Sequence, residues 1–206
     1  MESTKTRILK KLLETDGYLS GQDLCEQLGV SRTAVWKYMK QLKEEGYEIE
    51  AVQNKGYCLK DVPDVLGESE IKSRLHTRWA GQTLYYYDEI DSTNTQIKRL
   101  AEEDAPHGTL AVADYQSKGK GRRGHAWDSP HGSAIYMSIL FRPDIRPDRA
   151  SMLTLVIGLS VAQAIRDNLG LQAQIKWPND IVLNGKKLVG ILTEMSAQMN
   201  YIEYLV

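Results

Sequence analysis

Apolar side chains recur every three or four residues through the first part of the chain, which predicts three helices. The first covers residues 4–15, the second starts after the capping residue Ser20, and the third runs from Ser31 to Gly46. Two strand-like runs, YEIEAVQ and GYCLK, then flank the turn at residues 54–56. A capped helix pair with a glycine turn, followed by a hairpin, predicts a winged helix-turn-helix domain over residues 1–60.

The pattern changes after residues 61–68, DVPDVLGE, which lack periodicity and predict a linker. From residue 69 to residue 206 helical and strand-like periods alternate, with a long helix over 149–169 and a hairpin around Asn184-Gly185. This order predicts an α+β domain, with helices packed on one side of a mixed β-sheet.

Composition excludes several classes of protein. The 206 residues include 26 Lys and Arg against 27 Asp and Glu, and 42% are hydrophobic, which suits a folded chain. Neither an export signal nor an apolar run of about 20 residues stands out, so we expect a cytoplasmic protein without a membrane partner. Cys25 and Cys58 are far apart and predict small buried side chains, not a metal or redox site.

Charge is concentrated locally although the net charge is −1. Residues 31–43, in the third helix, contain four cations and no acid, which suits a helix that enters the major groove of DNA. We expect Arg32 and Thr33 to contact base edges, and Lys37, Lys40 and Lys55 to contact phosphates. The alternative is a solvated basic face on a protein-interaction domain.

Three loops of the second domain have candidate chemistry. The first, Asp91-Ser92-Thr93-Asn94, joins a strand to a helix. Ser92 or Thr93 would serve as an ordinary helix cap, and the same hydroxyl and amide groups could bind the polar head of a ligand.

The second loop, residues 116–127, holds four cations and three glycines between Lys118 and Gly124. It resembles GxGxxG, but no helix follows, so a dinucleotide site is not indicated. We expect a flexible loop that becomes ordered around phosphate, with a plain solvated loop as the alternative. Trp127 at the end of this loop suits either a core position or a flat surface for a purine.

The third loop is Lys176-Trp177-Pro178-Asn179-Asp180, at the end of a short strand. A partly buried Lys176 could hold a carboxylate and then the charge of an acyl phosphate, or it could simply pair with Asp180. The four histidines show neither metal-ligand spacing nor a Ser-His-Asp set, so no metal site and no nucleophile-based hydrolase is predicted.

Together these segments resemble a known family. DSTN, YQSKGKGRRGHAWDSPHGSAIYMSILFRP and KWPNDIVLNGKKLVGILTEM, behind VSRTAVWKYMKQLKEEGYEIEAVQNKGYCL, are similar to bifunctional biotin protein ligases, the bacterial biotin operon repressors. The resemblance implies a class II synthetase-like ligase fold with biotin, ATP and Mg²⁺ as substrates and cofactor. Its implied partners are a biotin carboxyl carrier protein, operator DNA and, when loaded with biotinyl-adenylate, a second copy of the chain.

The resemblance also implies roles for individual residues. Lys176 and Arg122 would be catalytic, and Arg123 and Trp127 would bind the nucleotide. The residues implied to bind biotin are Ser92, Thr93, Asn94, Gln116, Lys120, Gly121, Arg122 and Lys176.

This chain departs from the family pattern in places. Lys120 and His125 stand where arginine is common, and the GIGIN-type strand and small C-terminal domain of the family do not follow Val206. We therefore expect a C-terminally incomplete ligase domain over 69–206. Two alternatives remain, a DNA-binding repressor that only senses biotin or its adenylate, and a lipoate ligase-like enzyme.

Overall fold

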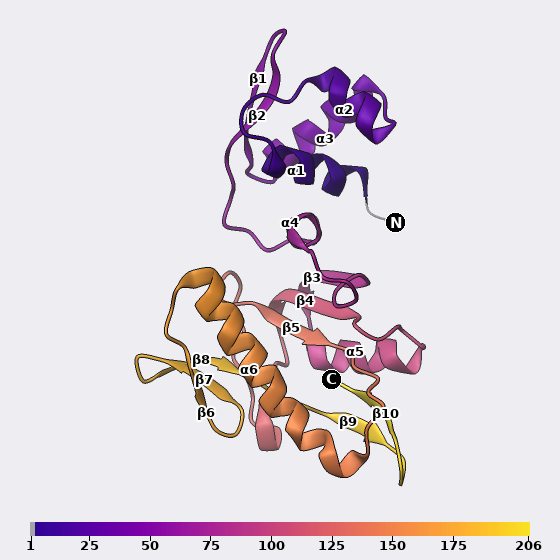
Figure 1. Cartoon of the computed structure of the whole chain (residues 1–206), viewed down its shortest axis with the longest axis vertical. Helices are drawn as coiled ribbons and strands as arrows, with labels where there is room; N and C mark the ends of the chain where they lie inside the picture. The colour runs from indigo at the N-terminus through magenta and orange to yellow at the C-terminus, as the bar shows by residue number, and fades with distance from the viewer. Residues whose placement is uncertain (1–2) are drawn as a thin grey trace. The chain divides into compact units, whose positions relative to one another are not determined.

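The computed structural model describes residues 3–206 and divides the chain into two compact units, one ending at His76 and one starting at Thr77 (Figure 1). Each unit has a hydrophobic core of its own.

The N-terminal unit has the predicted winged helix-turn-helix elements. Its helices are α1 (Thr4–Glu14), α2 (Gly21–Leu28) and α3 (Arg32–Glu44). The hydroxyl groups of Ser3, Ser20 and Ser31 accept hydrogen bonds from the first-turn amides of these helices, as N-caps do. Gly29 ends α2 with a φ of 66°, a left-handed conformation that glycine adopts without steric cost.

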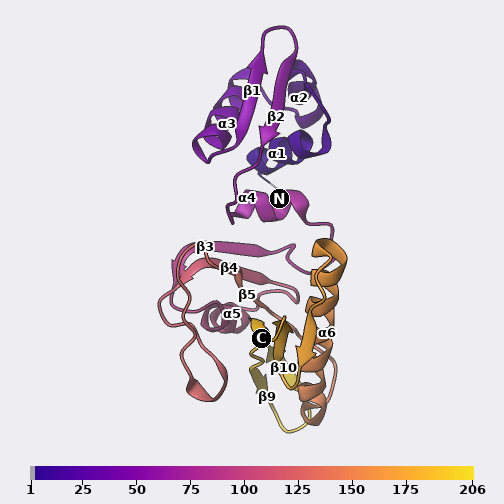
Figure 2. The ribbon, with the colours of Figure 1, turned by 90° about the vertical axis from the view of Figure 1, so that its left-hand side faces the viewer.

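Strands β1 (Glu48–Val52) and β2 (Gly56–Asp61) pair antiparallel as the wing (Figure 2). The core below them is formed by apolar faces of all three helices, among them Ile8, Leu9, Leu24 and Leu42. Cys58 is buried and Cys25 is half-buried, and both are free thiols, as expected.

Helix α4 (Glu68–Arg74) belongs to this N-terminal unit, whereas we expected it to open the second domain. Its Ser69 and Ser73 are buried, Ser69 lies 3.4 Å from the Thr6 hydroxyl, and Tyr47 donates a 2.6 Å hydrogen bond to Glu70. Burial and this carboxylate raise the pKa of Tyr47. Periodicity predicted the helix, but it does not indicate which of the two units the helix packs against.

The second unit opens with a parallel strand pair. Helix α5 (Thr93–Glu102) connects β3 (Leu84–Ile90) to β4 (Leu110–Gln116), and β5 (Tyr136–Ile139) then pairs antiparallel with β4. These three strands form a mixed sheet, and α5 packs on β4 and β5. Ile97 and Leu100 of α5 are buried with Ala111 and Leu140, which fixes the first turn of α5 beside the end of β4.

The rest of the unit contains one long helix and two smaller sheets. Helix α6 (Ala150–Leu169) packs against β6 (Gln174–Lys176) and β7 (Asp180–Leu183), which form an antiparallel sheet with β8 (Lys186–Gly190). Strand β9 (Met195–Ala197), which we did not predict, pairs with β10 (Ile202–Leu205). The α+β class is confirmed, but the strands of this unit are divided among three sheets.

Helix α6 is the long helix that the sequence predicted over residues 149–169. With the turn before it, it extends over Pro147–Leu169, 23 residues whose length and apolar composition alone would suffice to cross a membrane. The sequence-based expectation concerned an uninterrupted apolar run, and this segment is interrupted by Asp148, Arg149, Arg166 and Asp167. Its small residues Ala150, Gly158 and Ala162 are buried in the unit, so the helix packs on its neighbours through a narrow face.

Arg142 offers a test of how the second unit is held together. Its guanidinium donates hydrogen bonds to the carbonyl oxygens of Ala101 (2.8 Å), Ala105 (3.2 Å) and Glu203 (3.2 Å). Arg142→Met removes all of these hydrogen bonds, and we expect it to lower the free energy of unfolding by about 2–4 kcal/mol in urea titrations. The control Arg146→Met removes only an exposed ion pair with Asp148 and should cost less than about 0.5 kcal/mol. Equal losses would contradict this role.

Candidate functional site

A row of hydrogen-bonded polar side chains lies at the N-terminus of α5. The backbone amide of Thr93 donates to Gln116 Oε1 at 2.8 Å, and the Thr93 hydroxyl lies 2.8 Å from the Ser138 hydroxyl. Ser138 in turn donates to Asn94 Oδ1 at 2.5 Å, and Asn94 Nδ2 donates to Glu194 at 3.0 Å. We call Thr93, Asn94, Gln116, Ser138 and Glu194 the polar row.

Four segments supply the polar row: the start of α5, the end of β4, the middle of β5 and the loop before β9. Thr93 and Ser138 are buried, and the other three side chains are partly exposed. Ser92 is the N-cap residue of α5 by backbone geometry, but its side chain makes no capping hydrogen bond. The predicted position of the helix cap is therefore correct, but the polar contacts are made by Thr93 and Asn94.

Glu194 is the one acid of the polar row. Burial raises its pKa, but hydrogen bonds from Lys98 (2.7 Å) and Asn94, with the charges of Lys98 and Lys120, outweigh that effect and hold the pKa below its usual range. Glu194 is therefore ionised at neutral pH.

Gly119 fixes the base of the glycine loop against the polar row. Its carbonyl oxygen accepts from the Trp127 amide at 2.9 Å, and a β-carbon here would lie 2.3 Å from the Trp127 oxygen and 2.7 Å from Ser129 Oγ. Ser129 Oγ accepts from Gln116 Nε2 at 3.0 Å. Only glycine therefore lets the loop return close enough to orient Gln116.

The tip of the loop is a short hairpin that ends in a 3₁₀ turn at Arg122–Gly124. Gly121 donates to the carbonyl oxygen of His125 at 2.7 Å, and Arg123 adopts a left-handed φ of 56°. The side chains of Lys118, Lys120, Arg122 and Arg123 are exposed. Arg122 Nη1 also donates to Asn179 Oδ1 at 3.0 Å, so the second and third predicted loops are in contact.

The half-buried indole of Trp127 packs against strand β8. A β-carbon on Gly190 would be 3.0 Å from its indole, and the ammonium of Lys187 lies 4.9 Å from a ring centroid, a cation–π contact. The Lys187 ammonium is also 2.8 Å from Asp180. The indole therefore takes an intermediate position, with one part packed on the strand and another part exposed.

Lys176 does not match its predicted environment. We expected a partly buried lysine, but its side chain is exposed, because strand β6 lies at the edge of its sheet. Its alternative partner, Asp180, pairs with Lys187 instead. Within the KWPND segment, Asn179 makes the more extensive contacts, with Arg122 and with both backbone groups of Ile191.

The structure thus joins Thr93, Asn94 and Gln116 in one network and brings Arg122 to the KWPND loop, but leaves Lys176 apart in solvent. Sequence reasoning missed Ser129, Ser138, Lys187 and Glu194. Ser138 had a signal, since it occupies an inward position of an alternating strand where an apolar residue is normal. Glu194 could not be found in this way, because its contacts with α5 are long-range and leave no pattern in the neighbouring sequence.

The predicted DNA-contact residues lie on exposed surfaces of the N-terminal unit. Arg32, Thr33, Lys37 and Lys40 project from α3 and Lys55 lies in the turn of the wing, while Val35, Met39 and Leu42 face the core. A groove of about 510 Å³ between the start of α3 and the wing is lined in part by Arg32 and Lys55.

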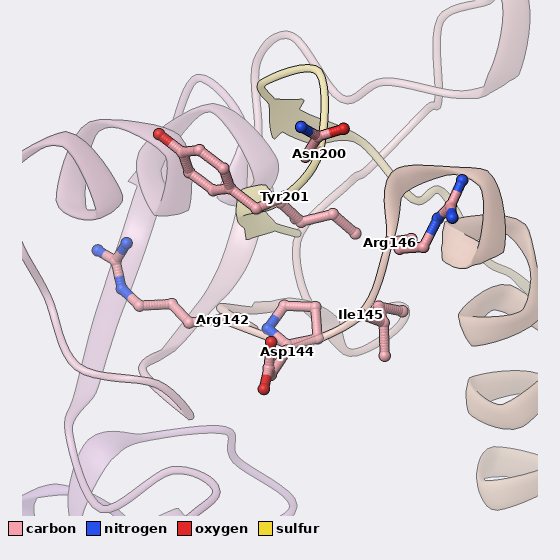
Figure 3. Close-up of a pocket in the computed structure, with 8 residues that line it drawn as sticks. Arg142, Asp144, Ile145, Arg146, Asn200 and Tyr201 are labelled. Carbon is pink, nitrogen blue, oxygen red and sulfur yellow. The ribbon is translucent and has the colours of Figure 1, made fainter.

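A hollow of about 370 Å³ in the second unit lies outside the predicted site (Figure 3). It is lined by residues 142–146 and 200–202, and none of the predicted ligand-binding residues is among them. Within residues 3–206 no three His, Cys, Asp or Glu side chains gather as metal ligands.

Fold and site together define a class of protein. A winged helix-turn-helix unit is linked to an α+β unit that has a polar row, a cationic glycine loop and an indole beside a lysine. Residues 86–204 match the biotin/lipoate A/B protein ligase family, and residues 4–58 match a helix-turn-helix domain model. The chain belongs to the biotin/lipoate A/B protein ligase family.

Curated relatives match nearly the whole chain. The bifunctional ligase/repressor BirA of Bacillus subtilis is 48% identical over 200 residues, 96% of this chain and 62% of the relative. BirA of Escherichia coli K12 is 36% identical over 91% of this chain and 57% of the relative. The chain thus spans about 60% of the length of these relatives. Among solved structures, a biotin protein ligase from Aquifex aeolicus in complex with biotin and ATP matches at TM-score 0.50 and 35% identity, covering 60% of this chain and 50% of that one.

The tight contact at Gly119 yields a testable prediction. Gly119→Ala forces the Trp127–Ser129 segment away and breaks the support of Gln116, so we expect a loss of about 1–3 kcal/mol in the free energy of unfolding. The matched control is Gly121→Ala, whose β-carbon would come no closer than 3.3 Å to its neighbours and which should cost clearly less. Chemical denaturation measures both, and a cost of Gly119→Ala no larger than the control would disprove the packing constraint.

Proposed function

We propose that the chain is an ATP-dependent biotin protein ligase that also acts as a biotin-responsive repressor. The observation that carries the ligase proposal is the polar row, with donors and acceptors fixed by its own hydrogen bonds, close in the fold to a cationic loop. The names of the relatives, ligase and repressor in one chain, support the same conclusion.

The reaction has two steps. The carboxylate of biotin attacks the α-phosphate of ATP, forming biotinyl-5′-adenylate and releasing pyrophosphate. A lysine amine of a biotin carboxyl carrier protein then attacks the acyl carbon and releases AMP. Both reactants of the first step are anions, so the site must neutralise their repulsion and align them.

Residues of this chain can be given roles in that chemistry. Thr93, Asn94 and Gln116 would bind the polar head of biotin, with Ser92 shaping the helix start. Lys120, Gly121, Arg122 and Arg123 would close over the carboxylate and phosphates, with Arg122 anchored on Asn179. Trp127 would present its indole to the adenine.

The lysine at the reacting atoms has two candidates. The sequence indicated Lys176, which is exposed, whereas Lys187 is held between Trp127 and Asp180. We assign the role to Lys187, because an ammonium already positioned beside the proposed nucleotide surface stabilises developing charge at lower entropic cost. Mg²⁺ would arrive with the phosphates of ATP, since residues 3–206 contain no cluster of metal ligands.

The winged helix would bind operator DNA through α3 and the wing, as a homodimer once the adenylate is bound, in the cytoplasm. Two other functions give different results in assays. A biotin sensor without ligase activity would bind biotin but release no pyrophosphate, and a lipoate ligase-like enzyme would prefer lipoate in calorimetry.

The two lysines can be separated by substitution. We expect Lys187→Met to lower biotin-dependent pyrophosphate release by about 10²–10³-fold, because it removes a preorganised cation. Lys176→Met should change the rate by less than about tenfold, since that side chain is solvated. A large loss confined to Lys176→Met would restore the assignment made from the sequence.

The DNA surface predicts a difference between two variants. Lys37→Ala should weaken binding to all sequences and reduce the slope of log K against log salt by about one unit, as loss of one phosphate contact does. Arg32→Ala should relax the preference at one base pair. Fluorescence anisotropy at several salt concentrations measures both, with Lys72→Ala on α4 as the control. A slope unchanged by Lys37→Ala would contradict phosphate contact.

A further inference from the structure

Glu194 determines the direction of the hydrogen bonds that Asn94 and Ser138 make in the polar row. An ionised carboxylate can only accept, so the side chain of Asn94 must present its amide nitrogen to Glu194, at 3.0 Å. Lys98, 2.7 Å from the other carboxylate oxygen, holds Glu194 in place. The orientation of the Asn94 amide is therefore fixed by a charge one hundred residues further along the chain.

The orientation of Asn94 in turn fixes whether Ser138 donates or accepts. Asn94 Oδ1 faces Ser138 and can only accept, so the Ser138 hydroxyl donates its single hydrogen there. With that hydrogen used, Ser138 can only accept from Thr93, and the single hydroxyl hydrogen of Thr93 has two acceptors, Ser138 Oγ at 2.8 Å and Gln116 Oε1 at 3.1 Å. Gln116 Oε1 is served by the Thr93 backbone amide, and Gln116 Nε2 donates one of its hydrogens to Ser129.

After these assignments the polar row still has unused hydrogen-bond donors and unused acceptors. Asn94 and Gln116 each keep one N–H, while the hydroxyl oxygens of Thr93 and Ser138 keep free lone pairs. A head group with both N–H donors and a carbonyl acceptor, such as a cyclic urea, fits this combination.

We propose that Glu194 is a positioning residue that sets the polarity of the polar row, meaning the direction of its Asn94 and Ser138 hydrogen bonds, and thereby selects a ureido head group. This inference rests on the proposed biotin ligase function and adds to it a residue that need not touch the ligand. With an uncharged amide at position 194, Asn94 could adopt either orientation, and the row would lose its fixed direction.

The test compares Glu194→Gln with a matched carboxylate-to-amide change. Glu203 also accepts two side-chain hydrogen bonds, from Ser196 at 2.5 Å and from Gln198 at 2.8 Å, but is not part of the polar row. We expect Glu194→Gln to weaken biotin binding at least about tenfold by calorimetry, the scale of one charge-assisted hydrogen bond. Desthiobiotin, which keeps the cyclic urea, should lose the same factor, and Glu203→Gln should lose none.

Steady-state kinetics distinguish positioning from general damage. In Glu194→Gln the KM for biotin should rise while the KM for ATP and kcat stay close to wild type. Lys98→Met, which leaves the acceptor for Asn94 in place, should have a smaller effect than Glu194→Gln. Equal biotin affinity in wild type and Glu194→Gln, or a parallel rise in the KM for ATP, would overturn the proposal.

A ligand-free measurement keeps this inference separable from the proposed function. In nitrogen-15 spectra of the full chain, the side-chain amide protons of Asn94 should shift as acid protonates Glu194, and Glu194→Gln should abolish that shift. Because the pKa of Glu194 is lowered, the shift should be complete only below its ordinary value near 4.5. If the wild type binds no biotin but shows this shift, the proposed function fails while the polarity of the row stands. Without the shift, the polarity itself is disproved.

Discussion

The hydrogen bond from the Thr93 amide to Gln116 Oε1 is the interaction on which the geometry of the second unit depends. It joins the first turn of α5 to the last residue of β4, the strand that α5 connects to its parallel neighbour. Gln116 can take part only because Ser129 holds its amide nitrogen, and Ser129 reaches it only because Gly119 has no side chain. One main-chain amide thus fixes the relation between the helix N-terminus, the sheet edge and the glycine loop.

Around this hydrogen bond, the exposed cations and the acid of the polar row lie on different segments of the chain. Cations are exposed on the glycine loop, whereas the one acid of the polar row is paired with Lys98 and lies behind Asn94. The surface open to a ligand is therefore positive or neutral, and the negative charge acts through an amide. This division suits the proposed ligands, with an uncharged polar head beside the polar row and anions beside the glycine loop.

Much of this could be predicted from local patterns, and the failures have physical reasons. Helices capped by Ser20 and Ser31, the wing, and the polar loop at Ser92 follow from residue preferences within a few positions. The environment of Lys176 did not, because burial at a strand end depends on which strand becomes the sheet edge. Helix α4 was predicted as a helix but assigned to the wrong unit, since its contacts with Thr6 and Tyr47 are long-range. Glu194 was missed for the same reason, because its partners Asn94 and Lys98 lie about a hundred positions away.

The crossover from β3 through α5 to β4 divides the contacts of the site by their separation along the chain. Thr93, Gln116, Ser129 and Ser138 all lie between residues 84 and 139, so their mutual hydrogen bonds need only one contiguous stretch of chain. The orientation of the Asn94 amide, by contrast, needs a carboxylate one hundred positions further along the chain. The contacts that give the site its shape are therefore local in sequence, whereas the contact that orients Asn94 is not.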